Sequence, residues 1–224
     1  MNRALSNKKN QFYVALIVSA FIIAAQWFLM KDVETNGVWE WLISSFFLFF
    51  ILPIVVIKFY FKGNLADFHL SFKFDFKDVL TVFVFGGLFI GLFFLLLVKL
   101  SWYKFFPASN LMFGGKGPFM FFEFIVFPLI LFFQEFFFRG FLLRSAEKAI
   151  GVIGGILIQL LAVLIFEYVF GATLHFVIFF SILVVSLFVS WLVFRTRTVF
   201  LTFLISWLVN IVINFTVFYY LNIP

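Results

Sequence analysis

Apolar segments of about 20 residues, nearly free of charged side chains, recur along this chain and constrain its fold most strongly. They cover residues 11–30, 39–61, 79–101, 118–138 and 199–222. A helix of this length and character crosses the roughly 30 Å hydrocarbon core of a bilayer. Only 12% of the 224 residues are charged, against about 25% in soluble domains. The sequence therefore predicts an all-α, polytopic transmembrane helical bundle, with residues 1–224 as a single membrane domain.

A longer apolar stretch lies between Lys148 and Arg195 and contains one acid, Glu167, and one histidine, His175. As a single helix it would measure about 65 Å, twice the hydrocarbon thickness. The cations at its two ends also favour the same side of the membrane. We therefore expect a hairpin that turns around Tyr168–His175, which brings the total to about seven spans.

The distribution of cationic residues predicts the orientation of these spans. If the N-terminus is cytoplasmic, twelve Lys and Arg residues fall in cytoplasmic segments and four in outer segments. Such an excess on the cytoplasmic side is the usual positive-inside bias. The sequence thus predicts a multi-pass protein of the plasma membrane with a cytoplasmic N-terminus.

Composition also excludes several classes of function. The chain has no cysteine, so disulfides, thiolate catalysis and cysteine-ligated zinc are ruled out. Its net charge of +6 is spread between apolar blocks and forms no basic stripe, so we expect membrane lipids as partners and no nucleic acid. A small transporter or channel is less favoured, because no inverted repeat or pair of broken helices is evident.

The densest polar cluster within an apolar segment is FFQEFFFRGFLLR, residues 132–144. Glu135 and Arg139 are four residues apart, so on a helix they share one face and can neutralise each other. Gln134 points about 100° away, toward a neighbouring helix. Ionisable residues inside the membrane are functional candidates by default. The alternative is that Arg139 only anchors the end of the span and Glu135 only pairs with it.

Other polar residues give weaker signals. His175 is predicted at membrane depth and could act as a general base beside a carboxylate, whereas His69 falls in a predicted cytoplasmic loop and is expected to be solvated. Ser206, Asn210 and Asn214 form a polar stripe with a spacing of four in the last span. An asparagine amide there could donate to a developing oxyanion. Hydrogen bonding between helices would explain the stripe equally well.

Two further acids lie in predicted spans. Glu123 precedes Gln134 by eleven residues, about 16 Å along a helix, which is too far to act on the same atom. Glu167 lies near the predicted hairpin turn and is expected to reach water. A zinc site would have to use Glu135, Glu167 and His175, which is a thin set of ligands, so we expect no metal and no cofactor.

Two segments carry a resemblance to a known family. QEFFFRGFLLR with His175 near the end of the next hydrophobic segment, and RTRTVFLTFLISWLVN, resemble the CPBP membrane proteins, which comprise CAAX prenyl endopeptidases and bacteriocin-processing proteins. The resemblance covers about residues 118–215. The family pattern is Glu-Glu-x-x-x-Arg, then Phe-x-x-x-His, then His-x-x-x-Asn. It implies an all-helical membrane bundle with a cavity open toward the cytoplasmic leaflet.

The resemblance implies a role for four residues. Glu135 matches the second glutamate of the first motif, Arg139 its arginine, His175 the histidine of the second motif, and Asn210 the final asparagine. In the family a glutamate and a histidine activate a water that attacks a peptide bond. The histidine and asparagine of the third motif stabilise the oxyanion.

The chain departs from the family pattern at three places. Gln134 occupies the position of the first glutamate, and a neutral amide cannot accept a proton from water. Ser206 occupies the position of the third-motif histidine. In the second motif Phe170 precedes His175 by five residues, and Gly171 occupies the position where phenylalanine is expected.

Two functions therefore compete. In the first, the chain is an intramembrane endopeptidase that cleaves a membrane-anchored or lipidated peptide, with Glu135 as base beside His175. In the second, it is a catalytically degenerate protein that acts as a non-enzymatic membrane binding or scaffold protein for a protein partner. The family class favours the enzyme. Both functions predict that Glu135, His175 and Asn210 converge on one water-accessible cavity in the cytoplasmic half of the membrane.

Overall fold

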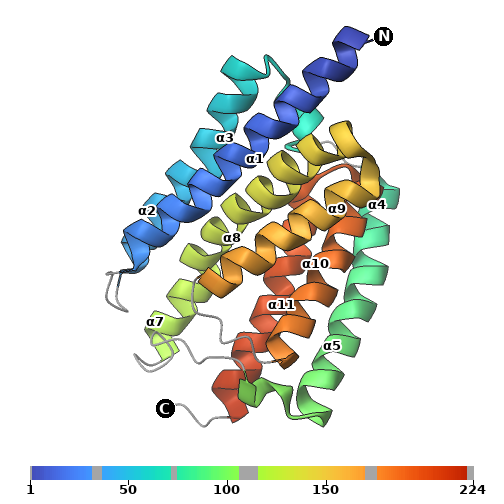
Figure 1. The fold of residues 1–224 in the computed structure, drawn as a ribbon. Helices are drawn as coiled ribbons and strands as arrows, with labels where there is room; N and C mark the ends of the chain where they lie inside the picture. The colour runs from blue at the N-terminus through green and yellow to red at the C-terminus, as the bar shows by residue number, and fades with distance from the viewer. Residues whose placement is uncertain (1, 32–36, 72–74, 106–115, 170–175, 221–224) are drawn as a thin grey trace.

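A computed structural model describes residues 2–31, 37–71, 75–105, 116–169 and 176–220 (Figure 1). Of these residues 93% are helical, and none of them forms a strand. The prediction of an all-α helical membrane bundle is confirmed.

The helices differ in length, and several are continued by π-helical segments. The long α-helices are α1 (Asn2–Met30), α5 (Gly87–Lys99), α9 (Leu143–Val169), α10 (Phe176–Thr196) and α11 (Val199–Tyr220). The shorter ones are α2 (Val38–Ser45), α3 (Leu52–Val55), α4 (Phe76–Thr81), α7 (Lys116–Phe121) and α8 (Phe127–Glu135). The π-helical segments are η1 (Phe46–Ile51), η2 (Val56–Tyr60), η4 (Val82–Gly86), η6 (Phe122–Val126) and η7 (Phe136–Leu142). Two 3₁₀ turns are η3 (Leu65–Phe68) and η5 (Trp102–Phe105).

Within the described residues, six helical stretches are long and apolar enough to cross a membrane. They are Lys8–Met30, Val38–Tyr60, Phe76–Lys99, Lys116–Val169, Phe176–Thr196 and Val199–Tyr220. Four of them agree with apolar segments picked out above, and Phe176–Thr196 is the second arm of the predicted hairpin. The turn of that hairpin lies at residues 170–175, outside the described part of the chain.

The longest stretch, Lys116–Val169, has 54 residues and reverses direction within its length. Gly151 has φ 84° and ψ 175°, a backbone conformation that residues other than glycine rarely adopt. A Cβ atom on Gly155 would lie 3.1 Å from the carbonyl oxygen of Leu143, although twelve residues of straight helix would separate the two by about 18 Å. The chain therefore folds back here, as Figure 1 shows between α8 and α9. The seven spans and the side of the N-terminus stay predictions.

The centre of the bundle is the continuous helix formed by α8 and η7. Its residues from Ile130 to Leu143 are almost all buried, and α2, η1, α9 and α11 pack around it. Phenylalanine supplies most of this core, including Phe136, Phe137 and Phe141, each 0% exposed. In lipid the hydrophobic effect does not drive helices together, so van der Waals packing of such side chains stabilises the bundle instead. The polar residues of the same helix are thereby held in a dry environment.

The loop after η2 is folded onto the end of the bundle that carries the N-terminus. The Val199 amide donates to the carbonyl oxygen of His69 (2.9 Å), and the Thr198 hydroxyl donates to the carbonyl oxygen of Ser71 (2.7 Å). The Arg144 guanidinium donates to the carbonyl oxygen of Asp67 (3.0 Å). These bonds hold a short loop over the helix ends and enclose its side chains. The expectation that His69 is solvated is therefore wrong, because its side chain is only 3% exposed.

Burial of His69 makes the stability of the fold depend on pH. Burial, and after it the Arg144 charge, lowers the pKa of His69 from 6.5 to about 4. The Glu147 charge opposes this shift, and Arg197 lowers the pKa by its charge but raises it by a backbone hydrogen bond. Because the folded state favours the neutral imidazole, this contribution is complete above pH 6.5 and is lost as the pH falls toward 4. We expect the free energy of unfolding to fall by about 3 kcal/mol over that interval, since each unit of pKa difference corresponds to about 1.36 kcal/mol.

Unfolding of the purified protein in detergent between pH 7 and 4 measures this effect. His69→Asn is the matched control, because asparagine does not titrate and tolerates the left-handed backbone at this position (φ 61°). The variant should show a much flatter pH dependence of unfolding free energy. An unchanged slope in His69→Asn would assign the effect to other groups.

Candidate active site

A cavity of about 300 Å³ lies between α8, η7, α9, α10 and α11. Apolar side chains such as Phe138, Val163 and Ile178 form much of its wall. Nine polar residues also line it: Gln134, Glu135, Arg139, Glu167, Ser181, Ser186, Ser206, Asn210 and Asn214. The first and last motif segments of the sequence, 134–144 and 195–210, are thus brought to one place, although 50 residues separate them.

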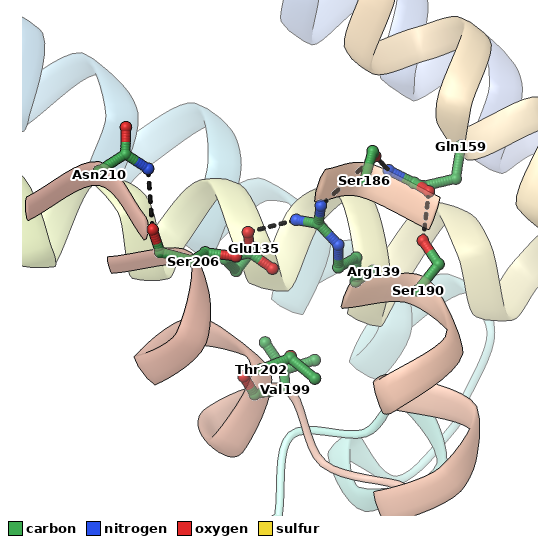
Figure 2. A network of polar contacts seen from close by, with 9 residues as sticks. All are labelled: Glu135, Arg139, Gln159, Ser186, Ser190, Val199, Thr202, Ser206 and Asn210. Atoms are coloured by element: carbon green, nitrogen blue, oxygen red, sulfur yellow. Dashed lines mark hydrogen bonds and ion pairs between the residues drawn. The ribbon is translucent and has the colours of Figure 1, made fainter. Parts of the chain in front are cut away.

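Glu135 and Arg139 form a buried ion pair at the junction of α8 and η7 (Figure 2). Their side chains are only 4% and 7% exposed, and Arg139 Nη1 donates to Glu135 Oε1. The spacing of four residues places both on one face, as the sequence predicts. The π-helical turn of η7 begins directly after Glu135, and such turns are frequent at functional sites. The pair brings opposite charges together where either charge alone would be very costly.

Arg139 continues into a hydrogen-bonded chain that crosses three helices. Arg139 Nη2 donates to Ser186 Oγ (3.4 Å), and Gln159 Nε2 donates to the same oxygen (3.1 Å). The Ser190 hydroxyl in turn donates to Gln159 Oε1 (2.7 Å). Gln159 and Ser190 are 0% exposed and Ser186 is 2% exposed. Side chains of α9 and α10 thus hold the Arg139 guanidinium in place through this network (Figure 2).

The polar stripe of α11 faces the same cavity. Ser206 lies beside the Glu135 carboxylate, and its hydroxyl and Glu135 Oε2 are both buried. Asn210 Nδ2 donates to the carbonyl oxygen of Ser206 within its own helix (2.9 Å). One amide hydrogen of Asn210 is therefore committed, and the other is available to a ligand.

Asn214 connects the cavity to a second buried acid. Its amide donates to Glu123 Oε2 (2.9 Å), and the Trp207 indole donates to the carbonyl oxygen of Glu123 (3.1 Å). Glu123 is 0% exposed and is absent from the cavity wall, in keeping with the predicted distance from Gln134. Asn214 therefore makes a hydrogen bond between helices, which is the second of the two explanations given for the polar stripe.

Two predicted features lie partly outside the described residues. His175 falls in the segment 170–175, so its position relative to Glu135 and Asn210 stays a prediction. Among the described residues, no three His, Cys, Asp or Glu side chains gather where they could hold a metal ion. The zinc ligand set weighed above includes His175 and is therefore not tested.

A larger cavity of about 960 Å³ lies between α1 and α9, but its chemistry is different. The described residues of its wall are almost entirely apolar and include no carboxylate and no cation; Ser19 and Tyr168 are among the few polar side chains. It uses Ile158, Ala162 and Ile165 of α9, whereas the smaller cavity uses Val163, Phe166 and Glu167. Helix α9 therefore separates the two spaces, and the smaller polar one is the candidate active site.

Sequence reasoning missed Gln159, Ser186 and Ser190. A signal for them exists, because Gln159 is an amide within a long apolar stretch and the two serines are four residues apart. Nothing in the sequence alone shows that they meet Arg139.

One comparison with known proteins gives a match, and it falls on this site. Residues 116–212 match the family model described as "Rce1-like: Type II CAAX prenyl endopeptidase Rce1-like". The resemblance to the CPBP family is confirmed over this segment. The Rce1-like segment contains α7 to α10 and most of α11, and thus every polar residue of the cavity wall except Asn214. No curated protein and no solved structure matches the chain.

Proposed function

We propose that this protein is an intramembrane endopeptidase that hydrolyses a peptide bond of a membrane-anchored or lipidated substrate with a carboxylate-activated water. The observation that carries the proposal is the buried Glu135–Arg139 pair, which lines a polar cavity inside the segment that matches the CAAX endopeptidase family. A protein of spanning helices meets such substrates in the plane of the bilayer. The family match supports a protease of this kind and leaves the substrate open.

Each polar group has a role in this proposal. Arg139 compensates the charge of Glu135, so a carboxylate can persist in a dry site and accept a proton from a water molecule. The resulting hydroxide attacks the carbonyl carbon, and the oxyanion then takes hydrogen bonds from Ser206 and the uncommitted N–H of Asn210. His175 remains the predicted partner of Glu135.

A non-enzymatic binding or scaffold protein is the second candidate, and two substitutions favour it. Gln134 and Ser206 both line the cavity, so the two departures from the family pattern fall within the site itself. Loss of a general base typically lowers a rate by about 10²–10⁴-fold, and loss of an oxyanion donor by about 10²–10³-fold. A site without the general base and the oxyanion donor would still bind a peptide but would cleave it very slowly.

Cleavage assays in reconstituted vesicles distinguish the two candidates. Wild type should cleave some members of a panel of lipidated and membrane-anchored peptides, and Glu135→Gln should lower that rate by about 10²–10⁴-fold. Glu147→Gln is the matched control, since this acid pairs with Arg144 and Arg197 outside the cavity. Peptide binding without cleavage, equal in wild type and Glu135→Gln, would support the scaffold.

A further inference from the structure

Glu167 is a carboxyl group in the candidate active site that the proposed mechanism does not use. It lines the same cavity as Gln134 and Glu135, and unlike Glu135 it is only partly buried. Among the described residues it has no hydrogen-bond or ion-pair partner. Arg139 is the single cation among the described residues of the cavity wall, and it is bound to Glu135. Within the described part of the wall, the Glu135 carboxyl group is thus paired with a cation and the Glu167 carboxyl group is not.

The position of Glu167 follows from the face of α9 on which it lies. Gln159, Val163 and Glu167 follow one another at intervals of four residues, so they share one face of the helix. Gln159 and Val163 are both buried, and Gln159 reaches the serine that also holds Arg139. The opposite face of α9 borders the apolar cavity. Glu167 thus points to the polar side of α9.

The antiparallel course of α8 and α9 gives the offset of the two acids along the bundle axis. Glu135 lies one turn from Arg139, about 6 Å along its helix, and Glu167 lies two turns from Gln159, about 12 Å along α9. Since Arg139 and Gln159 meet at Ser186, the two acids differ by about 6 Å along the bundle axis. Both carboxyl groups line one cavity, and an axial offset of this size leaves space for a water and a scissile bond between them.

We propose that Glu167 is the general acid of peptide hydrolysis in this site, a role that rests on the proposed function. Since no described residue places a free cation beside Glu167, the neutral acid is the form that costs least in a largely apolar cavity. Two carboxyl groups in different environments commonly divide the roles of acid and base in this way.

Water gives one proton to the Glu135 carboxylate while its oxygen bonds to the carbonyl carbon. Neutral Glu167 gives its proton to the peptide nitrogen as the carbon–nitrogen bond breaks. The products are a carboxylic acid and an amine, and the proton on Glu135 returns to Glu167 through water. The arrangement needs no metal or further reactant.

The decisive variant is Glu167→Gln. Glu167→Gln should lower kcat by about 10²–10⁴-fold with a small change in KM, and the alkaline limb of the pH–rate profile should disappear. Glu123→Gln, a buried acid away from the cavity wall, should retain the alkaline limb.

A labelling experiment tests the same carboxyl group without catalysis. A hydrophobic carbodiimide adds to protonated carboxyl groups in apolar sites, so wild type in vesicles should be labelled at Glu167 and not at Glu135, as read by peptide mass spectrometry. Labelling of Glu135 in preference to Glu167, or none at Glu167, would overturn the assignment.

The outcomes separate this inference from the proposed function. If wild type cleaves and Glu135→Gln does not, while Glu167→Gln keeps its rate and alkaline limb, the inference fails and the proposed function stands. The inference also fails if His175→Gln, and not Glu167→Gln, removes the alkaline limb. Absence of cleavage by wild type contradicts the proposed function and the acid role together, even if Glu167 is labelled.

Discussion

Replacing Gln134 by glutamate and Ser206 by histidine in the same chain is expected to raise the rate of peptide cleavage by about 10²-fold or more. The first change supplies a second carboxylate beside Glu135, and a general base typically contributes about 10²–10⁴-fold. The second change replaces a hydroxyl by a stronger donor for the oxyanion, for which about 10²–10³-fold is typical. Both side chains face the cavity of about 300 Å³, so the new groups meet the substrate.

The single variants and one further substitution control this experiment. Gln134→Glu conserves the shape of the side chain and should account for most of the gain, whereas Ser206→His is larger and should contribute less. Adding Glu135→Gln to the double variant should remove most of the increase, because the gain depends on the original carboxylate. If the double variant folds with an unchanged Tm and cleaves no peptide, the two substitutions do not explain a loss of protease activity. That result would favour the non-enzymatic scaffold protein.

Arg139→Leu is expected to destabilise the protein by about 3–5 kcal/mol, because it leaves the Glu135 carboxylate buried without its cation. The same change removes a donor to Ser186. Replacing both partners with leucine should be far less damaging than replacing Arg139 alone, since no uncompensated charge remains. The measurement is the free energy of unfolding in mixed micelles for the two single variants and the double variant.

Arg197→Leu is the matched control for this cycle. Arg197 is 57% exposed and pairs with Glu147 at 3.4 Å, and exposed ion pairs of this kind contribute about 0–1 kcal/mol. Equal losses for Arg139→Leu and Arg197→Leu would contradict the buried pair. A double leucine variant as unstable as Arg139→Leu would show that the cost arises from packing and not from charge.

The predictions from sequence succeeded where local chemistry decides the outcome. The apolar blocks identified the long helices because about 20 uncharged residues have few alternatives to a spanning helix. The cluster of Gln134, Glu135 and Arg139 was identified as the centre of interest because ionisable groups are costly in lipid. The spacing of four residues also predicted the Glu135–Arg139 pair, which the structure contains.

The predictions were wrong or incomplete where distant parts of the chain meet. His69 is buried because α11 begins beside its loop and hydrogen-bonds to it, a contact between residues 130 positions apart. Gln159 was passed over because its partners lie on another helix. Glu167 was expected near a turn and within reach of water, and the sequence did not indicate that its place on α9 puts it in the cavity wall with Glu135.

The amino-acid sequence by itself determined that this chain enters a membrane, which segments are helical, and which few side chains carry chemistry there. Those properties follow from the free energy of single residues in lipid, and each can be assessed residue by residue. Only the tertiary structure decided which polar groups share one cavity. That choice depends on the chain reversal at Gly151 and on the rotation of α9, whose two faces border spaces of opposite character. Helix rotation is set by packing against neighbours from the whole chain, so no local pattern specifies it.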